Sequence, residues 1–293
     1  MRWTPGGRSA DLEDRRGEGG GGGGFRIGGG GLGIGGFIVL LLLSFIFKRN
    51  FFALVGAGGG PSGPTAATGR PAPTTPEEEK MIQFVSVILD DVQKTWEQEF
   101  SRLGRTYHHA KLDTFTDSIR SGCGFAETAM GPFYCPVDQR AYIDLGFYKE
   151  LKDRFGAPGE FAQAYVLAHE IGHHVQHELG IDEKVRAAQE QDPSSAKPLS
   201  VRLELQADCF AGIWAHSLKQ RSTADSPIAI DENDVESALT AAAAVGDDRI
   251  QKQATGAVNP ETWTHGSSKQ RVQWFRTGLE TGDINRCDTF AGR

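Results

Sequence analysis

An uncharged apolar run divides this chain into parts that cannot all belong to one globule. The run covers residues 31–47, is interrupted by a Lys-Arg-Asn triplet, and resumes over residues 51–55. A membrane-spanning helix needs about 17–25 apolar residues, so the run is just long enough. The long segment before it and the lack of a small-x-small cleavage site argue against a cleaved signal peptide. We therefore expect a transmembrane anchor at residues 31–55 rather than a signal peptide or a buried core helix.

The segments beside this run offer little to bury. Residues 1–36 are mostly glycine, arginine and acidic residues, and residues 56–76 are glycine, proline, alanine, threonine and serine. Such sequences cannot offset the conformational entropy lost on folding. We expect a disordered Gly/Arg-rich tail (1–30), a flexible linker (56–78) and one domain (79–293) that is long enough for a sizeable core.

The charge pattern limits the partners. The formal net charge of −7 is mild, and no basic stripe runs through the predicted domain. This excludes a nucleic-acid-binding class, and no nucleotide partner is expected. The acidic excess is interpreted as a solvated surface. The partners that remain are a membrane, through residues 31–55, and a peptide or protein substrate.

Two features bear on the side of the membrane on which the domain lies. Arginines precede the apolar run and Lys48 and Arg49 follow it, which gives a slight preference for a cytoplasmic N-terminus. The four cysteines, which form no Cys-x-x-Cys metal motif, are Cys123, Cys135, Cys209 and Cys287. They could form disulfides or remain buried free thiols. Disulfides need an oxidising compartment. We therefore expect a single-pass protein of the cytoplasmic membrane with its domain on the periplasmic or extracellular side.

Residue periodicity predicts a mainly helical α+β domain. Apolar residues recur at helical spacing after Pro76, and this helix is expected to end near Leu103. Between residues 105 and 145, short aromatic or β-branched runs predict strands of a small antiparallel sheet. Further helices are expected at residues 147–155, 160–179, 182–191, 198–219, 231–254 and 269–280. A small sheet with helices beside it is an α+β fold, here preceded by one transmembrane helix.

The sequence His-Glu-Ile-Gly-His lies inside the apolar helix predicted over residues 160–179. Its two histidines, His169 and His173, are four residues apart and share one helix face, so both can reach one Zn²⁺ ion. Glu170 is about 100° round the helix, where it can act as a general base on water activated by zinc. His177 is one turn further along and is interpreted as structural or as a support for the ligands, and His174 points away from the ligand face. The alternative is a coincidental pair of surface histidines.

A catalytic zinc ion needs a third protein ligand. A third histidine of the metzincin kind is excluded, because Leu179 occupies its position and Gln176 replaces the expected glycine. Glu204, on the helix predicted after Pro198, would complete a His₂Glu ligand set. Asp208 lies one turn further on the same face and can accept a hydrogen bond from a ligand histidine. The alternative for these two acids is a solvated helix face, but their apolar neighbours indicate a buried one.

The two central motifs resemble those of the bacterial neutral zinc metallopeptidase family. They read Ala-His-Glu-Ile-Gly-His-His-Val-Gln and Glu-Leu-Gln-Ala-Asp-Cys-Phe-Ala-Gly-Ile-Trp-Ala. The resemblance extends to Gly-Pro-Phe-Tyr-Cys-Pro, Val-Gly-Asp-Asp-Arg-Ile-Gln and Thr-His-Gly-Ser-Ser-Lys-Gln-Arg, and to the Gly/Arg-rich start followed by one apolar span. It implies a zincin of the gluzincin type with one catalytic zinc ion bound by His169, His173 and Glu204.

A late histidine, His265, is a second catalytic candidate. Gluzincins often supply such a residue to donate a hydrogen bond to the oxyanion, although a capping or core role is the alternative. A peptide would lie along the sheet edge, for which the strand at residues 141–145 is the candidate. The function expected is a membrane-anchored zinc metallopeptidase. The alternatives are a zinc-binding scaffold without proteolytic activity and a zinc amidohydrolase acting on a non-peptide envelope substrate.

Overall fold

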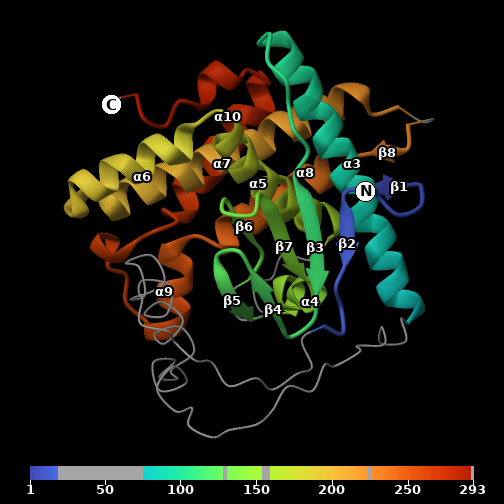
Figure 1. Ribbon diagram of the computed structural model, residues 1–293, viewed down its shortest axis with the longest axis horizontal. Helices are drawn as coiled ribbons and strands as arrows, with labels where there is room; N and C mark the ends of the chain where they lie inside the picture. The colour runs from blue at the N-terminus through green and yellow to red at the C-terminus, as the bar shows by residue number, and fades with distance from the viewer. Residues whose placement is uncertain (19–74, 128–130, 154–158, 224–225, 292–293) are drawn as a thin grey trace, which may run out of the picture.

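The computed structural model describes residues 1–18, 75–127, 131–153, 159–223 and 226–291. In this part of the chain a four-stranded sheet packs against a group of helices, and two short strand pairs share no backbone pairing with that sheet (Figure 1). One large apolar cluster lies between the sheet and the helices, and a smaller one lies under the strand hairpin. The fold is mainly helical and α+β, as the sequence predicts.

The helix predicted from Pro76 is α3, Pro76–Arg102. Thr75 caps its start: the Thr75 hydroxyl accepts a hydrogen bond from the Glu78 backbone nitrogen, and the Glu78 carboxylate accepts one from the Thr75 backbone nitrogen. The apolar stripe of α3, including Trp96 and Phe100, is fully buried. The last residues assigned to the linker, 76–78, therefore belong to this helix.

The main sheet is mixed, not antiparallel as expected. Its strands, in order, are β2 (Leu12–Asp14), β3 (Lys111–Phe115), β7 (Arg140–Asp144) and β6 (Phe133–Cys135). β2, β3 and β7 are parallel, and only β6 is antiparallel to its neighbour. The expectation was wrong because it assumed that successive short runs pair as hairpins. Instead β4 (Ser118–Ser121) and β5 (Gly124–Glu127) form a separate hairpin. The long connection from β3 to β7, which includes this hairpin and β6, lets β7 run parallel to β3.

The expected disordered tail is wrong for residues 1–18. β2 forms an edge of the sheet, and β1 (Arg2–Trp3) pairs with β8 (Ile228–Ala229). The Ser9 hydroxyl donates a hydrogen bond to Asp90 of α3 at 2.5 Å, and Arg15 donates one to fully buried Asp113 of β3 at 2.8 Å. The expectation considered only apolar burial, whereas backbone pairing and buried charges bind this segment to the domain.

Four helices surround the predicted site. They are α5 (Glu160–Glu178), α7 (Ala196–Arg221), α8 (Glu232–Ala244) and α10 (Ser268–Thr281). Glycines let α7 and α10 pack backbone to backbone, because a Cβ on Gly212 would overlap the Phe275 carbonyl oxygen. A Cβ on Gly278 would likewise overlap the Cys209 carbonyl oxygen. The two helices are therefore fixed against each other without intervening side chains.

The helix expected over residues 231–254 is broken in the structure. Its second part is α9 (Asp247–Thr255), separated from α8 at Gly246. A side chain at Gly246 would overlap the backbone of Ser268, so this position tolerates only glycine. The other helices of the described ranges are α4 (Leu145–Asp153) and α6 (Ile181–Gln191). Because of this break, α9 begins at Asp247, and this residue belongs to the site described below.

All four cysteines are paired in disulfides. Cys123, in the turn between β4 and β5, bonds to Cys135 of β6. Cys209 of α7 bonds to Cys287, in the turn Ile284–Cys287 that follows α10. The first bridge fixes the hairpin to the sheet edge, and the second fixes the end of the chain to the helix of the predicted third ligand.

The predicted anchor at residues 31–55 and most of the predicted linker lie outside the described residues. Within the described ranges, no helix combines the length and the apolar character that crossing a membrane requires.

Removing the buried carboxylate that joins the N-terminal segment to the sheet should destabilise the domain. Asp113 also accepts hydrogen bonds from Arg140, and neither arginine keeps a buried partner in Asp113→Ala. The free energy of unfolding should fall by about 2–3 kcal/mol, measured by urea denaturation. Glu13→Ala is the matched control, because Glu13 pairs with Arg140 from a half-exposed position and should contribute less than about 1 kcal/mol. Equal losses in the two variants would contradict this role of Asp113.

Candidate metal centre

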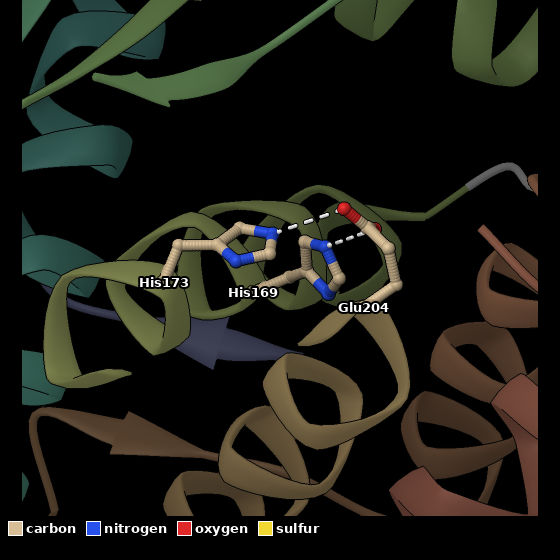
Figure 2. Close-up of side chains that lie close together, drawn as sticks. All are labelled: His169, His173 and Glu204. Atoms are coloured by element: carbon tan, nitrogen blue, oxygen red, sulfur yellow. Dashed lines mark ion pairs between the residues drawn. The ribbon is translucent and has the colours of Figure 1, made fainter. Parts of the chain in front are cut away.

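The helices that carry the predicted ligands, α5 and α7, pack closely where the site lies. Gly172 is at this contact, and a Cβ there would lie 3.0 Å from the Ala207 carbonyl oxygen. The close approach brings His169 and His173 of α5 to Glu204 of α7. Figure 2 shows both imidazole rings directed towards the Glu204 carboxylate.

The donor atoms of these three residues have the spacing of a zinc site. His169 Nε2 lies 3.2 Å from Glu204 Oε2, and His173 Nε2 lies 3.5 Å from Glu204 Oε1. One donor atom from each residue lies within 4.8 Å of the other two. Ligand atoms at about 2.0–2.2 Å from a tetrahedral zinc ion are about 3.4 Å from one another. The cluster therefore fits a zinc ion held by two imidazole nitrogens and one carboxylate oxygen.

Hydrogen bonds to the other ring nitrogens leave both Nε2 atoms free to bind a metal. His169 Nδ1 donates to Asp208 Oδ1 at 3.0 Å. This is the hydrogen bond that the sequence predicts for Asp208. His173 Nδ1 donates to Gln176 Oε1 at 2.9 Å. The Gln176 amide nitrogen donates to the Leu203 carbonyl oxygen at 2.7 Å, which points its oxygen at His173. Both rings thus have the tautomer that presents an Nε2 lone pair to the metal.

Gln176 has a role that the sequence analysis missed. There it served only to exclude the metzincin pattern, yet it lies one turn after His173 on the same helix. The sequence offered one signal for this contact: Gln176 lies three residues after His173, and residues i and i+3 are neighbours on a helix surface. Whether the side chain pointed towards the ring depended on α7, which the sequence alone did not place.

Arg271 of α10 is the second residue that the sequence analysis missed. It is almost fully buried, and it donates to Asp208 through Nε at 2.7 Å and through Nη2 at 2.8 Å. The Tyr165 hydroxyl donates to the same carboxylate at 2.5 Å. Burial raises the pKa of Asp208, but Arg271 and His169 outweigh burial and keep the pKa below its usual value. Asp208 therefore remains a carboxylate that orients His169.

Glu170 is buried on α5 beside the ligand cluster. Burial raises the pKa of Glu170 above its usual value, although the neighbouring His169 and His173 oppose the shift. A carboxylate with a raised pKa is a better proton acceptor near neutral pH than an ordinary glutamate.

His265 lies near the cluster because Asp247 fixes its loop. Asp247 Oδ2 accepts hydrogen bonds from the backbone nitrogens of Thr264, His265 and Gly266 at 2.8, 2.6 and 3.0 Å. Asp247 Oδ1 accepts from His265 Nδ1 at 3.2 Å. Partial burial lowers the pKa of His265, but the hydrogen bond to Asp247 and the charge of Glu204 outweigh this effect and raise the pKa. The side chain is 42 % exposed, so a substrate can reach it.

The two remaining histidines of α5 have other partners. His174 Nε2 donates to the His108 carbonyl oxygen at 2.7 Å, and His174 Nδ1 accepts from the Tyr134 hydroxyl at 3.0 Å. His177 Nδ1 lies 2.9 Å from Asp182. Neither joins the cluster of three donors. The motif helix thus presents two histidines to a metal and uses the other two in contacts with β6, the loop before β3, and α6.

These observations define a class of protein: a mainly helical α+β domain with a His₂Glu metal centre on two closely packed helices. The chain matches the family described as "Putative neutral zinc metallopeptidase" over residues 1–290, and it belongs to that family. Zinc is therefore its cofactor, and His169, His173 and Glu204 form the site that can hold it.

Two groups of relatives extend this finding. The chain is 43% identical over 295 residues to "Uncharacterized protein YpfJ" of Escherichia coli strain K12, and 99% of each chain is covered. It is 50% identical over 193 residues to "Uncharacterized protein Mb2605" of Mycobacterium bovis and "Uncharacterized protein Rv2575" of Mycobacterium tuberculosis, with 64% of each chain covered. No solved structure matches. The names of these relatives state no substrate.

Loss of the oxygen that orients His173 should weaken zinc binding. In Gln176→Leu the His173 ring has no acceptor at Nδ1, and the zinc dissociation constant should rise about 10–100-fold, as for other ligand-orienting residues. Competition with a chromophoric chelator measures this constant without reference to activity. His177→Ala is the matched control on the same helix and should leave zinc affinity unchanged. An unchanged affinity in Gln176→Leu would show that the ring needs no such support.

Proposed function

We propose that this protein is a zinc-dependent peptidase in which His169, His173 and Glu204 bind the metal and Glu170 is the general base. The observation that carries the proposal is the position of buried Glu170 beside three donor atoms with zinc-site spacing. A bound zinc ion polarises a carbonyl group and makes water a stronger nucleophile at neutral pH. The family to which the chain belongs supports a peptide or protein substrate.

In this mechanism Glu170 moves the proton. It accepts a proton from the attacking water, and the resulting carboxylic acid then donates a proton to the leaving amine. Burial favours the protonated form between these two steps, because it raises the pKa of Glu170. Asp208 and Gln176 keep the ligand rings in one orientation during the reaction.

His265 is proposed to donate a hydrogen bond to the oxyanion. Its Nδ1 is bonded to Asp247, so its Nε2 can face the substrate. The break between α8 and α9 places Asp247 where it also fixes the loop backbone around His265. A donor positioned before the reaction stabilises the developing negative charge more than mobile water does.

The peptide is proposed to add to the sheet at β6. The strand expected for this role, at residues 141–145, corresponds to β7, which has β3 on one side and β6 on the other. It therefore has no free edge. β6 is the terminal strand of the sheet within the described residues, and Tyr134 of β6 bonds to His174 of α5, the metal-binding helix. Backbone hydrogen bonds to β6 would align an extended peptide beside the metal centre.

The two disulfides support a location outside the cytoplasmic membrane. Disulfides persist in oxidising compartments such as the bacterial periplasm and are rare in the cytosol. Both bridges join separate elements of the domain. Contact with a membrane through residues 31–55 stays a prediction from the sequence.

Replacing the base should separate metal binding from catalysis. Glu170→Gln should retain one zinc ion and lose at least about a hundredfold in kcat, because an amide cannot accept the proton. Zinc analysis and cleavage of denatured protein substrates, with and without a chelator, measure the two effects. Glu160→Gln, at the start of the same helix, is the matched control and should keep full activity.

The same assay distinguishes the alternatives. An active Glu170→Gln variant would refute Glu170 as the base. A wild-type protein that retains zinc and cleaves no protein or peptide would instead favour the scaffold. Chelator-sensitive release of amines from envelope material alone would favour the amidohydrolase.

Removing the proposed oxyanion donor should reduce the rate without loss of metal. His265→Ala should lower kcat about 100-fold, with zinc affinity unchanged, because its contribution arises in the transition state. Steady-state kinetics and chelator competition provide the two measurements. His108→Ala changes an exposed histidine outside the cluster and should have no effect on kcat. A change confined to KM would assign His265 to substrate binding instead.

A further inference from the structure

A chain of hydrogen bonds through two buried amides leads from the ligand His173 to the C-terminal part of the protein. The Gln176 amide nitrogen donates to the Leu203 carbonyl oxygen at 2.7 Å and to Gln206 Oε1 at 3.1 Å. The Gln206 amide nitrogen donates in turn to the Cys287 carbonyl oxygen at 3.0 Å. Gln176 is 1 % exposed and Gln206 is 4 % exposed, so bulk water does not compete for these bonds. The side chains of Gln176 and Gln206 are named here the amide relay.

The amide relay has one direction of donors and acceptors. The Cys287 carbonyl can only accept, so Gln206 presents its nitrogen there and its oxygen to Gln176. Gln176 therefore presents its nitrogen to that oxygen and its own oxygen to His173 Nδ1, at 2.9 Å. Reversing either amide would place donors against donors and acceptors against acceptors. Nδ1 of His173 thus carries the proton, and Figure 2 shows the other ring nitrogen facing Glu204.

The C-terminal residues lie along α7 where the amide relay ends. Cys287 is bonded to Cys209, which lies three residues after Gln206 and therefore near it on the helix surface. The Thr289 hydroxyl donates to the Arg202 carbonyl oxygen at 2.7 Å, one turn before Gln206. The disulfide and the hydrogen bond to Gln206 hold the fully buried Cys287 against α7 at two points.

We propose that Gln206 is a positioning residue for His173, and that the C-terminal turn closed by the Cys209–Cys287 bridge fixes the amide of Gln206. Gln206 acts through Gln176. Zinc binds the imidazole nitrogen that carries no proton, so the amide relay favours the metal-binding form of His173 before the ion arrives. The inference rests on the metal site of the proposed function and does not depend on peptide cleavage.

Removing the Gln206 amide should weaken zinc binding without changing a ligand. In Gln206→Met, a side chain of similar length, the Gln176 nitrogen keeps only the Leu203 carbonyl oxygen as acceptor. The zinc dissociation constant of the full-length chain, measured by chelator competition, should rise about 3–10-fold, less than for a residue that contacts a ligand directly. Gln189→Met is the matched control, because this amide donates to the Ala196 carbonyl oxygen and lies outside the amide relay. An unchanged constant in Gln206→Met would overturn the proposal.

A double-mutant cycle separates positioning through Gln176 from a general loosening of the helices. When Gln206→Met is added to Gln176→Leu, the zinc dissociation constant should change by less than about twofold, because the path to His173 is already broken. A general loosening would instead weaken zinc binding by the same factor in both backgrounds. That additive result would also overturn the proposal.

Removing the bridge tests the part played by the C-terminal turn. The paired substitution Cys209→Ala and Cys287→Ala should raise the zinc dissociation constant about 3–10-fold, and should have no further effect in Gln206→Met. Removing the other bridge, through Cys123→Ala and Cys135→Ala, is the matched control and should leave zinc affinity unchanged. Unchanged affinity without the Cys209–Cys287 bridge would refute the role of the turn. Where that variant does not fold, the Gln206→Met cycle decides.

These readouts are independent of catalysis. Each is a zinc affinity, so a chain that binds zinc in this way and cleaves no peptide would refute the proposed function alone. A chain that cleaves peptides and shows additive effects in the cycle would refute the role of Gln206 alone.

Discussion

The metal centre depends on one buried ion pair, between Asp208 and Arg271. Asp208 lies on α7, its hydrogen-bond partner His169 on α5, and Arg271 on α10, so the carboxylate joins three helices at one point. A buried carboxylate without a cation would favour its protonated form, whose oxygens are weaker acceptors for His169 Nδ1. The guanidinium opposes this by donating to both carboxylate oxygens, and Oδ1 also accepts from the imidazole of His169 and from the Tyr165 hydroxyl. The tautomer of the first ligand thus follows from the packing of α10.

Charge balance gives this arrangement a further consequence. Glu170, Glu204 and Asp208 are carboxylates at or near the buried centre, and Arg271 is the buried cation beside them. With neutral histidines, the ionised groups need a divalent cation to approach neutrality. A monovalent counter-ion would leave an excess of negative charge in a low-dielectric site. With zinc held by two neutral imidazoles the charge of the centre would be close to balanced. Without a metal, a proton on His169 supplies positive charge instead, because burial lowers the pKa of His169 but Asp208 and Glu204 outweigh burial and raise it to about 9.

The sequence predicts what depends on helix periodicity and misses what depends on packing between elements. His169, His173 and Glu204 could be found because four-residue spacing and a known ligand set identify them. Arg271 could not, since nothing in α10 indicates that this arginine rather than Lys269 faces inward. The mixed sheet and the docked N-terminal segment were missed for the same reason. Parallel pairing joins residues about a hundred positions apart, such as Leu12 and Leu112, and leaves no local pattern in either strand.

Backbone constraints at glycines that bind no metal also affect the chemistry of the site. Gly172 sets the approach of α5 to α7, and Gly212 and Gly278 set that of α7 to α10. Any side chain at the last two positions would separate the helices and move Arg271 away from Asp208. Gly246 breaks the alanine-rich helix so that Asp247 begins a new one and can bind the loop around His265. In each case a glycine lets two backbones approach where the catalytic side chains must converge, so substitutions there should impair the centre although glycine offers it no side chain.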